Sequence, residues 1–315
     1  MSSNIKGSVI GFIGMILALF THMIIKDLSN QVDFLITIFS RFCFSLPLLF
    51  IFVYVARKNS FLQVNNWNYV FLRSFFGIIT MISVFLSLQL IPIGLVTALA
   101  QSSAIFVTLL APFFVKEKIG VYRWTAVLIG LFGVYLMTNP LSIISGTSNL
   151  SALGISLATF SAISHAGLAL TMRKLGKTEH PTTTAFIHNV ITTSLVIISI
   201  LLFGSNFIGI KGQHGIEIIF YPNKFLYILL TLGIIGSFIQ YFMATSYKYA
   251  EATILVTIRY LAIPLAVIFG YIIWEETLNI NQIFGGILIL MACILITFRE
   301  IKSKKNKLST SDSAI

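Results

Sequence analysis

Ten long apolar stretches, separated by short polar breaks, constrain this chain more than any other feature of its sequence. A helix that crosses the hydrocarbon core of a bilayer needs about 20 apolar residues. Ten stretches meet that requirement, at roughly 7–25, 34–56, 69–90, 94–115, 121–138, 153–172, 183–203, 225–246, 252–273 and 280–298. The sequence therefore predicts an all-α integral membrane protein with ten transmembrane helices.

Composition supports a chain that is solvated by lipid. Hydrophobic residues make up 57% of the sequence and charged residues only 10%, whereas a soluble domain carries about a quarter charged residues. The net charge of +11 could indicate nucleic-acid binding, which needs a basic face on a folded soluble domain. No polar stretch is long enough to form such a domain, so we expect lipid and a small molecule as partners and no nucleic acid. The stretch 7–25 is interpreted as an uncleaved span because no small-x-small cleavage site follows it.

Lysine and arginine in the loops predict the orientation, because they gather on the cytoplasmic side of a membrane protein. With a cytoplasmic N-terminus, 15 of the 21 Lys and Arg residues fall inside, three fall outside and three fall within spans. Both termini are therefore predicted to be cytoplasmic, which agrees with an even number of spans. The segment 302–315 is basic and then serine-rich, and it is interpreted as a disordered cytoplasmic tail.

The second half of the sequence echoes the first. An offset of 159 places Gln101 on Tyr260 and Glu117 on Glu276, and an offset of about 147 relates the first spans of the two halves. The predicted units are 1–148 and 149–301, each with five spans, and an odd number turns the second unit upside down. Inverted repeats are typical of transporters whose substrate site lies near the membrane midplane. Chance similarity between apolar segments is the alternative.

On these residues the chain resembles the EamA family of the drug/metabolite transporter superfamily. The resemblance is carried by the segment 112–117, by glutamates that close the fourth span of each unit, by arginines in spans two and three, and by glycines in the fifth span of each unit. Besides the segment 112–117, the residues are Arg41, Arg73, Gly130, Gly133, Pro264, Trp274, Glu275, Glu276, Gly285 and Gly286. It covers about 7–298 and implies a ten-helix carrier in a bacterial inner membrane. The segment 249–261 is similar to the branch that carries S-adenosylmethionine; other branches carry amino acids, riboflavin or purines.

Polar residues within the spans are candidates for the substrate site, because an ionisable group inside a membrane is costly and is by default functional. Arg41 and Arg259 lie deep in spans two and nine, and no Asp or Glu lies at comparable depth. A cavity of positive potential suits a carboxylate or phosphate, which arginine binds with a planar fork. The predicted substrate-binding residues are Arg41, Gln101, His165, Gln240, Arg259 and Tyr260.

Each of these residues also has a structural interpretation. A histidine in a membrane helix often makes a helix-to-helix hydrogen bond, and we favour that role for His165, His188 and Asn189. Polar stripes on one face of a span, such as the one that contains Gln101, either line a path or join helices. Arg73 lies near the cytoplasmic end of its span and can extend to the interface. Glu117 and Glu276 are interpreted as structural, because the helix dipole favours a carboxylate near a helix N-terminus.

Other classes of protein lack their signatures here. The sequence has no H-E-x-x-H or G-x-S-x-G motif and no phosphate-binding loop, and Ile280 replaces the arginine that a Glu-Glu-x-x-x-Arg membrane protease would need. Cys43 and Cys293 lie in apolar stretches without metal-ligand spacing, so neither a metal nor a cofactor is expected. We therefore expect a secondary transporter rather than an enzyme, with an efflux permease, a membrane enzyme or a channel as alternatives. The substrate, the direction, the coupling ion and the oligomeric state, including a homodimer, stay open.

Overall fold

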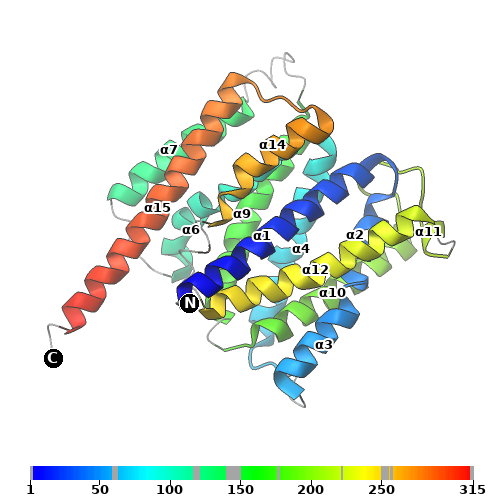
Figure 1. The fold of residues 1–315 in the computed structure, drawn as a ribbon, viewed down its shortest axis with the longest axis horizontal. Helices are drawn as coiled ribbons and strands as arrows, with labels where there is room; N and C mark the ends of the chain where they lie inside the picture. Colours follow the sequence, from blue (N-terminus) through cyan, green and yellow to red (C-terminus); the bar gives the residue numbers. More distant parts are fainter. Residues whose placement is uncertain are drawn as a thin grey trace.

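The computed structural model describes residues 3–58, 63–115, 121–139, 150–175, 178–220, 223–249, 255 and 258–312. Across these residues the regular secondary structure is helical, with turns and loops between the helices and one isolated bridge between Val32 and His214. Figure 1 shows the helices, which in chain order are α1 (Ser3–Asp27), η1 (Leu28–Asn30), α2 (Phe34–Cys43), α3 (Leu46–Arg57), α4 (Trp67–Leu90), α5 (Ile93–Gln101), α6 (Ser103–Val115), α7 (Val121–Thr138), α9 (Ala152–Leu175), α10 (Pro181–Phe203), α11 (Glu217–Phe220), α12 (Lys224–Tyr249), α14 (Ala262–Trp274) and α15 (Ile280–Asp312).

The protein is an integral membrane protein by the length and apolar character of its helices. Among the described residues, seven helical segments are long and apolar enough to cross a bilayer, and three shorter apolar helices lie at Trp124–Thr138, Ala262–Trp274 and Ile280–Ile296. The predicted number of ten spans is thus not established by the helices alone. α15 continues as one helix to Asp312, where the sequence suggested a disordered tail from 302 onward.

Two of the predicted spans are interrupted helices. The stretch 34–56 divides into α2 and α3 around Phe44 and Ser45, and the stretch 94–115 divides into α5 and α6 at Ser102. In both cases a serine hydroxyl donates to a carbonyl three residues earlier, from Ser45 to Phe42 and from Ser102 to Leu99, each at 2.6 Å. Such side-chain bonds compete with the backbone ladder and bend helices. Hydrophobicity is continuous through both sites, so periodicity alone did not reveal the breaks.

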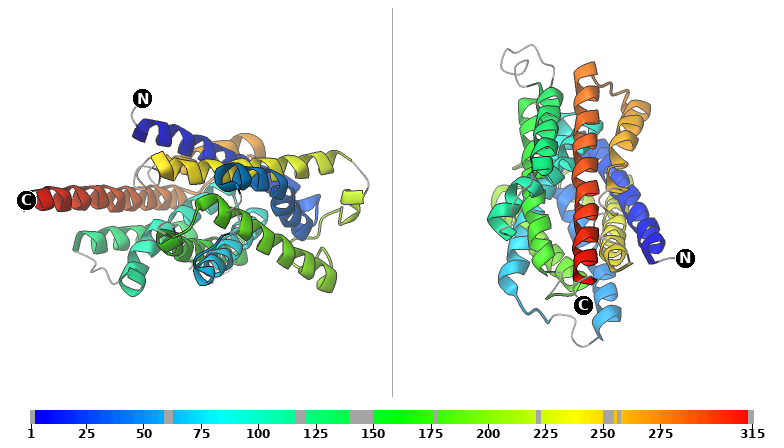
Figure 2. Two further views of the ribbon diagram at one scale, coloured as in Figure 1. Left: turned by 90° about the horizontal axis from the view of Figure 1, so that it is seen from below. Right: turned by 90° about the vertical axis from the view of Figure 1, so that its left-hand side faces the viewer.

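The helices pack mostly against partners that are distant in sequence. α1 lies against α12, α4 against α9, α5 against α14 and α7 against α15, while α2 contacts both α10 and α12. The pair formed by α7 and α15 lies along one side, and the C-terminal end of α15 projects beyond the other helices (Figure 2). These pairs bury the centre of the bundle between the N-terminal and C-terminal halves of the chain.

Glycines allow the backbones of α7 and α15 to approach closely. A Cβ added at Gly133 would lie 2.8 Å from the carbonyl oxygen of Gly285, and one added at Gly285 would lie 2.6 Å from that of Gly133. Small residues give membrane helices the close van der Waals contact that replaces a hydrophobic driving force in lipid. The glycines that carry the sequence resemblance in these two helices therefore have a packing role.

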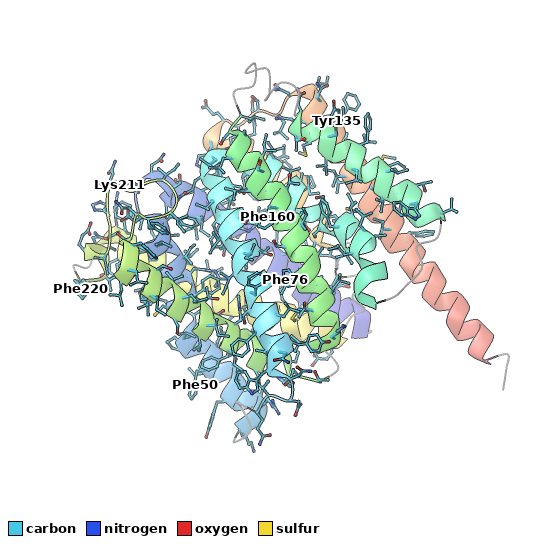
Figure 3. All side chains as sticks on the ribbon, turned by 180° about the vertical axis from the view of Figure 1, so that it is seen from behind. Phe50, Phe76, Tyr135, Phe160, Lys211 and Phe220 are labelled. Carbon is cyan, nitrogen blue, oxygen red and sulfur yellow. The ribbon has the colours of Figure 1, made fainter. Side chains whose placement is uncertain are left out.

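Apolar side chains cover the outside of the bundle. In Figure 3, Phe50, Phe160 and Tyr135 mark this outer surface, and they are 43%, 49% and 44% exposed. Exposed apolar area on this scale is incompatible with water as the surrounding solvent. The surface agrees with a chain that is embedded in lipid.

One carboxylate fixes the polar segment that precedes α11. Asp33 is buried and accepts hydrogen bonds from the hydroxyl of Ser205 at 2.5 Å and from the backbone N–H of Gly212 at 3.0 Å. Its own N–H donates to the carbonyl of His214 at 2.9 Å. The segment is thereby joined to the start of α2, and all of these polar groups are satisfied within the loop.

Candidate functional site

The breaks in two helices meet at the centre of the molecule. α5 ends at Gln101, and the backbone turns at Tyr260 and Leu261 before α14 begins. The side-chain amide of Gln101 donates to the carbonyl of Arg259 at 3.4 Å, and α5 and α14 are in contact. Gln101 and Tyr260, the pair of positions that the predicted repeat would superpose, therefore lie together in the structure.

α15 adds a thiol to this contact. The Cys293 thiol donates to the carbonyl of Gln101 at 3.7 Å, and the Cys293 thiol also interacts with the side chain of Tyr260. Both Tyr260 and Cys293 are buried. The thiol thus belongs to the polar centre, although the sequence places it in an apolar stretch.

α9 brings a histidine to the same place. Nε2 of His165 lies 3.5 Å from Nη2 of Arg259, at the limit of a hydrogen bond. Four of the six predicted residues, Gln101, His165, Arg259 and Tyr260, are therefore close together. They come from α5, α9 and the segment before α14, so both halves of the chain contribute.

Arg41 forms a separate part of the candidate site. It lies on α2, is 2% exposed, and its guanidinium is 5.6 Å from the centre of the Phe42 ring. Nε and Nη1 have no hydrogen-bond partner among the described residues. A buried charge without a partner costs several kcal/mol, so this group is expensive to keep unless it binds something.

A glycine on α12 makes room for this guanidinium. A Cβ added at Gly236 would overlap Nη1 and Cζ of Arg41. Gln240, the remaining predicted residue, lies one turn further along α12 on the same face and is partly exposed. His22 on α1 interacts electrostatically with both Arg41 and Arg259.

The structure adds a polar network that the sequence did not place in the site. Asn189 on α10 is fully buried, and its Nδ2 donates to the hydroxyl oxygen of Ser45. The Ser237 hydroxyl on α12 donates to the Ser45 carbonyl at 3.0 Å. The helix-to-helix hydrogen bond predicted for Asn189 is therefore confirmed. The position of this network beside Arg41 depends on contacts between three helices and could not be read from one of them.

Arg73, in contrast, has its donors satisfied by neighbouring helices. Its Nη1 donates to the carbonyl of Thr184 at 2.7 Å, and its Nε lies 3.1 Å from the sulfur of Met172. These contacts join α4 to α9 and α10. These contacts agree with a structural role for Arg73.

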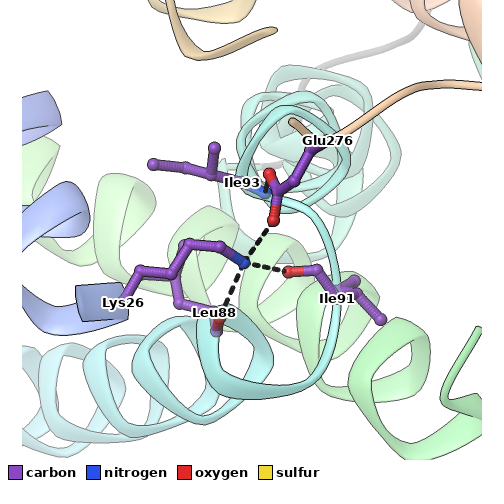
Figure 4. Close-up of polar contacts among 5 residues, drawn as sticks. All are labelled: Lys26, Leu88, Ile91, Ile93 and Glu276. Atoms are coloured by element: carbon purple, nitrogen blue, oxygen red, sulfur yellow. Dashed lines mark hydrogen bonds and ion pairs between the residues drawn. The ribbon is translucent and has the colours of Figure 1, made fainter. Parts of the chain in front are cut away.

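An ion pair joins the two halves at one end of the bundle (Figure 4). Nζ of Lys26, at the end of α1, lies 2.6 Å from Oε1 of Glu276, and it donates to the carbonyls of Leu88 and Ile91 at 3.3 and 3.1 Å. Oε2 of Glu276 accepts the N–H of Ile93 at 2.9 Å. The ammonium thus caps the end of α4, while the carboxylate caps the start of α5.

The backbone after α14 aims Glu276 inward. Glu275 adopts a left-handed conformation with φ 54° and ψ 27°, and the N–H of Glu276 returns to the carbonyl of Gly270 at 3.1 Å. The structural role predicted for Glu276 agrees with these contacts, although its partner Lys26 is 250 positions away. Glu117, its counterpart in the predicted repeat, lies outside the described residues.

A lipid-exposed helical bundle that encloses paired and unpaired charges from both halves defines the class of polytopic membrane transporters. The chain belongs to the EamA-like transporter family, whose family model matches residues 5–139 and 152–298. The predicted family is thereby confirmed, and the protein is a membrane transporter of metabolites.

Individual relatives are similar over most of their length. An S-adenosylmethionine uptake transporter of Rickettsia prowazekii (strain Madrid E) is 27% identical over 98% of this chain and 99% of its own. The pseudopaline exporter CntI of Pseudomonas aeruginosa (strain UCBPP-PA14) is 25% identical over 71% of this chain and 73% of its own. A solved protein crystal structure has a TM-score of 0.60 and 16% identity over 94% of this chain and 97% of its own, which supports the fold.

Proposed function

We propose that the protein is a secondary transporter that moves a small metabolite with a carboxylate group by alternating access. The observation that carries this proposal is Arg41, a guanidinium that is 2% exposed in the middle of a span and has two nitrogens without a partner among the described residues. Arginine binds a carboxylate with two parallel hydrogen bonds. In a protein whose described spans hold no deep acid, the substrate is the natural source of the counter-charge.

Alternating access in this proposal rests on two inverted units of five helices. An offset of 147 maps 34 and 57, the limits of α2 and α3, onto 181 and 204, beside α10 at Pro181–Phe203. An offset of 159 maps the start of α7 at 121 onto 280, where α15 begins, and maps the break at Ser102 onto Leu261. The packing supports the two units as well. If α1 corresponds to α9, α2 to α10 and α4 to α12, the contact between α4 and α9 corresponds to that between α12 and α1. The contact between α2 and α12 then corresponds to that between α10 and α4.

The ion pair between Lys26 and Glu276 supports the other requirement of the mechanism, which is a barrier on one side of the site. It connects the end of α1 to the segment after α14 and holds the junction of α4 and α5. In the proposed orientation, with both termini in the cytoplasm of a bacterial inner membrane, this is the outer side. We infer that the pair holds the outer barrier closed and separates when that side opens.

S-adenosylmethionine is the first candidate substrate. The R. prowazekii relative, which spans nearly the whole chain, is named for its uptake, and the methionine part of the molecule provides the carboxylate. The exporter among the relatives favours efflux as the second candidate direction. The arginines and Tyr260 suit an anionic group and an aromatic ring, respectively.

Reconstitution in liposomes tests the proposal. Labelled S-adenosylmethionine is added outside, with or without the unlabelled compound trapped inside, and the recovered label is identified chemically. We expect saturable uptake of the unchanged compound that internal substrate accelerates. Uptake that does not saturate would indicate a channel, a changed product would indicate an enzyme, and no uptake by folded protein would exclude this substrate and leave other carboxylates to be tested.

A further inference from the structure

The hydroxyl of Ser45 already donates its proton elsewhere, and this fixes the orientation of the Asn189 side-chain amide. The Ser45 hydroxyl donates to the Phe42 carbonyl at 2.6 Å, so its oxygen can only accept from Asn189. The amide must therefore present Nδ2 to Ser45, and Oδ1 points elsewhere. Oδ1 has no partner among the described residues, and Asn189 is 0% exposed. The structure thus holds an acceptor of known orientation that nothing in the protein satisfies.

The residue that binds this amide, Ser45, lies close in the chain to Arg41 with its unpaired guanidinium. Ser45 follows Arg41 by four residues and lies in the turn between α2 and α3. On α12 the adjacent residues Gly236 and Ser237 contact Arg41 and Ser45, respectively. Unpaired donors and an unpaired acceptor therefore follow each other along a single seam between α2, α10 and α12.

We propose that this seam binds the α-amino-acid head group of the substrate, with the carboxylate on Nε and Nη1 of Arg41 and the ammonium on Oδ1 of Asn189. This inference rests on the proposed function and names the substrate class of the same site. A simple carboxylate would need donors only, and an unpaired buried acceptor would then remain a net cost. A zwitterion satisfies the donors and the acceptor together.

The role of Asn189 is specificity, and Ser45 is the residue that positions it. A ligand without the amine would leave Oδ1 unpaired, and a hydrogen bond to a charged group is expected to discriminate by about 10- to 100-fold. The neighbouring imidazole of His188 is held by packing, 5.6 Å from the Phe42 ring and against Gly77. It therefore serves as a wall of the site in this proposal.

Binding to purified full-length protein in detergent tests the proposal without any need for transport. The probes are S-adenosylmethionine and methionine, with 4-(methylthio)butanoate as the analogue without the amine and methioninol as the analogue without the carboxylate. We expect wild type to bind each truncated analogue at least about 10-fold more weakly than methionine. In Asn189→Leu, the analogue without the amine should bind as well as methionine does, while the analogue without the carboxylate should still bind more weakly. In Asn189→Asp, the analogue without the amine should still bind more weakly than methionine. Arg41→Gln should remove the penalty for the missing carboxylate only.

The matched control is Thr193→Val, which changes another buried polar side chain one turn along α10. It should leave both penalties unchanged, whereas a general loosening of α10 would alter them. Equal binding of methionine and its desamino analogue by wild type, an unchanged pattern in Asn189→Leu, or no binding of any amino-acid ligand would each overturn the proposal. If the head-group pattern holds but no compound crosses liposomes, this site stands and the transport proposal fails.

Discussion

Lys26 and Arg41 are cations on the first two helices, and their surroundings are opposite. Lys26 is 12% exposed and has Glu276, two carbonyl oxygens and the ring of Trp274 as partners. Arg41 is 2% exposed and keeps two nitrogens unpaired among the described residues. The more deeply buried cation is thus the less satisfied one. This difference separates a charge that stabilises one conformation from a charge that is kept for a ligand.

The largest expected effect comes from the unpaired cation. Arg41→Gln removes two charge-assisted hydrogen bonds to the substrate, so binding should fall by about 100-fold or more. The apparent melting temperature should stay the same or rise, because an uncompensated buried charge is removed. Uptake in liposomes and thermal unfolding in detergent measure the two effects. Lys211→Gln, on the exposed polar loop, is the control, and a lower melting temperature in Arg41→Gln would mean that Arg41 has structural partners.

The paired cation should show the reverse pattern. Lys26→Met leaves Glu276 without its counter-charge and uncaps α4, and it should destabilise the protein by about 2–3 kcal/mol, because breaking a buried pair costs more than removing it whole. Thermal unfolding measures this loss, and substrate binding should change little. The double variant Lys26→Met with Glu276→Gln should recover most of the stability. Glu275→Gln is the control, because it removes a negative charge from the residue adjacent to Glu276. A loss of stability in Glu275→Gln equal to that in Lys26→Met would contradict the stabilising role of the pair between Lys26 and Glu276.

A smaller effect is expected at the glycine beside Arg41. Gly236→Ala places a Cβ where the guanidinium lies, so Arg41 must move and uptake should fall by about 10-fold, because misplaced binding groups act less efficiently. Gly286→Ala is the matched control, since its Cβ would meet only the flexible end of Met137 at 3.6 Å. Equal uptake by both variants would show that the position of Arg41 is not critical.

The smallest effect should appear at the turn that aims the paired carboxylate. Glu275 has φ 54°, a conformation that costs a side-chain-bearing residue about 1–2 kcal/mol and glycine almost nothing. Glu275→Gly should therefore raise the free energy of unfolding by about 0.5–1 kcal/mol after the entropy cost of glycine. Denaturant unfolding in detergent measures it. Destabilisation would instead assign a contact to the Glu275 side chain.

The sequence predicted which residues lie deep within the apolar spans, but it did not predict which residues distant in the chain contact each other. Hydropathy alone placed Arg41 and Arg259 inside spans, and the repeat related Gln101 to Tyr260, which lie together across the α5–α14 contact. Lys26 was counted only as a loop charge, because its partner Glu276 is 250 positions away. The helix breaks at Ser45 and Ser102 lie within apolar runs, and the serine hydroxyl bonds found there also occur at Ser87 within the unbroken helix α4, so the sequence pattern does not reveal the breaks.

The interrupted helices at Ser102 and Leu261 have a consequence for water. A backbone that leaves the helical ladder within a membrane keeps polar groups that lipid cannot satisfy, so such a segment must face protein or a hydrated space. Because the two interruptions lie where α5 meets α14, we expect the interior of the protein to be locally polar there. We expect this region to be hydrated from one side at a time, so that solvent reaches it by the same route as the substrate.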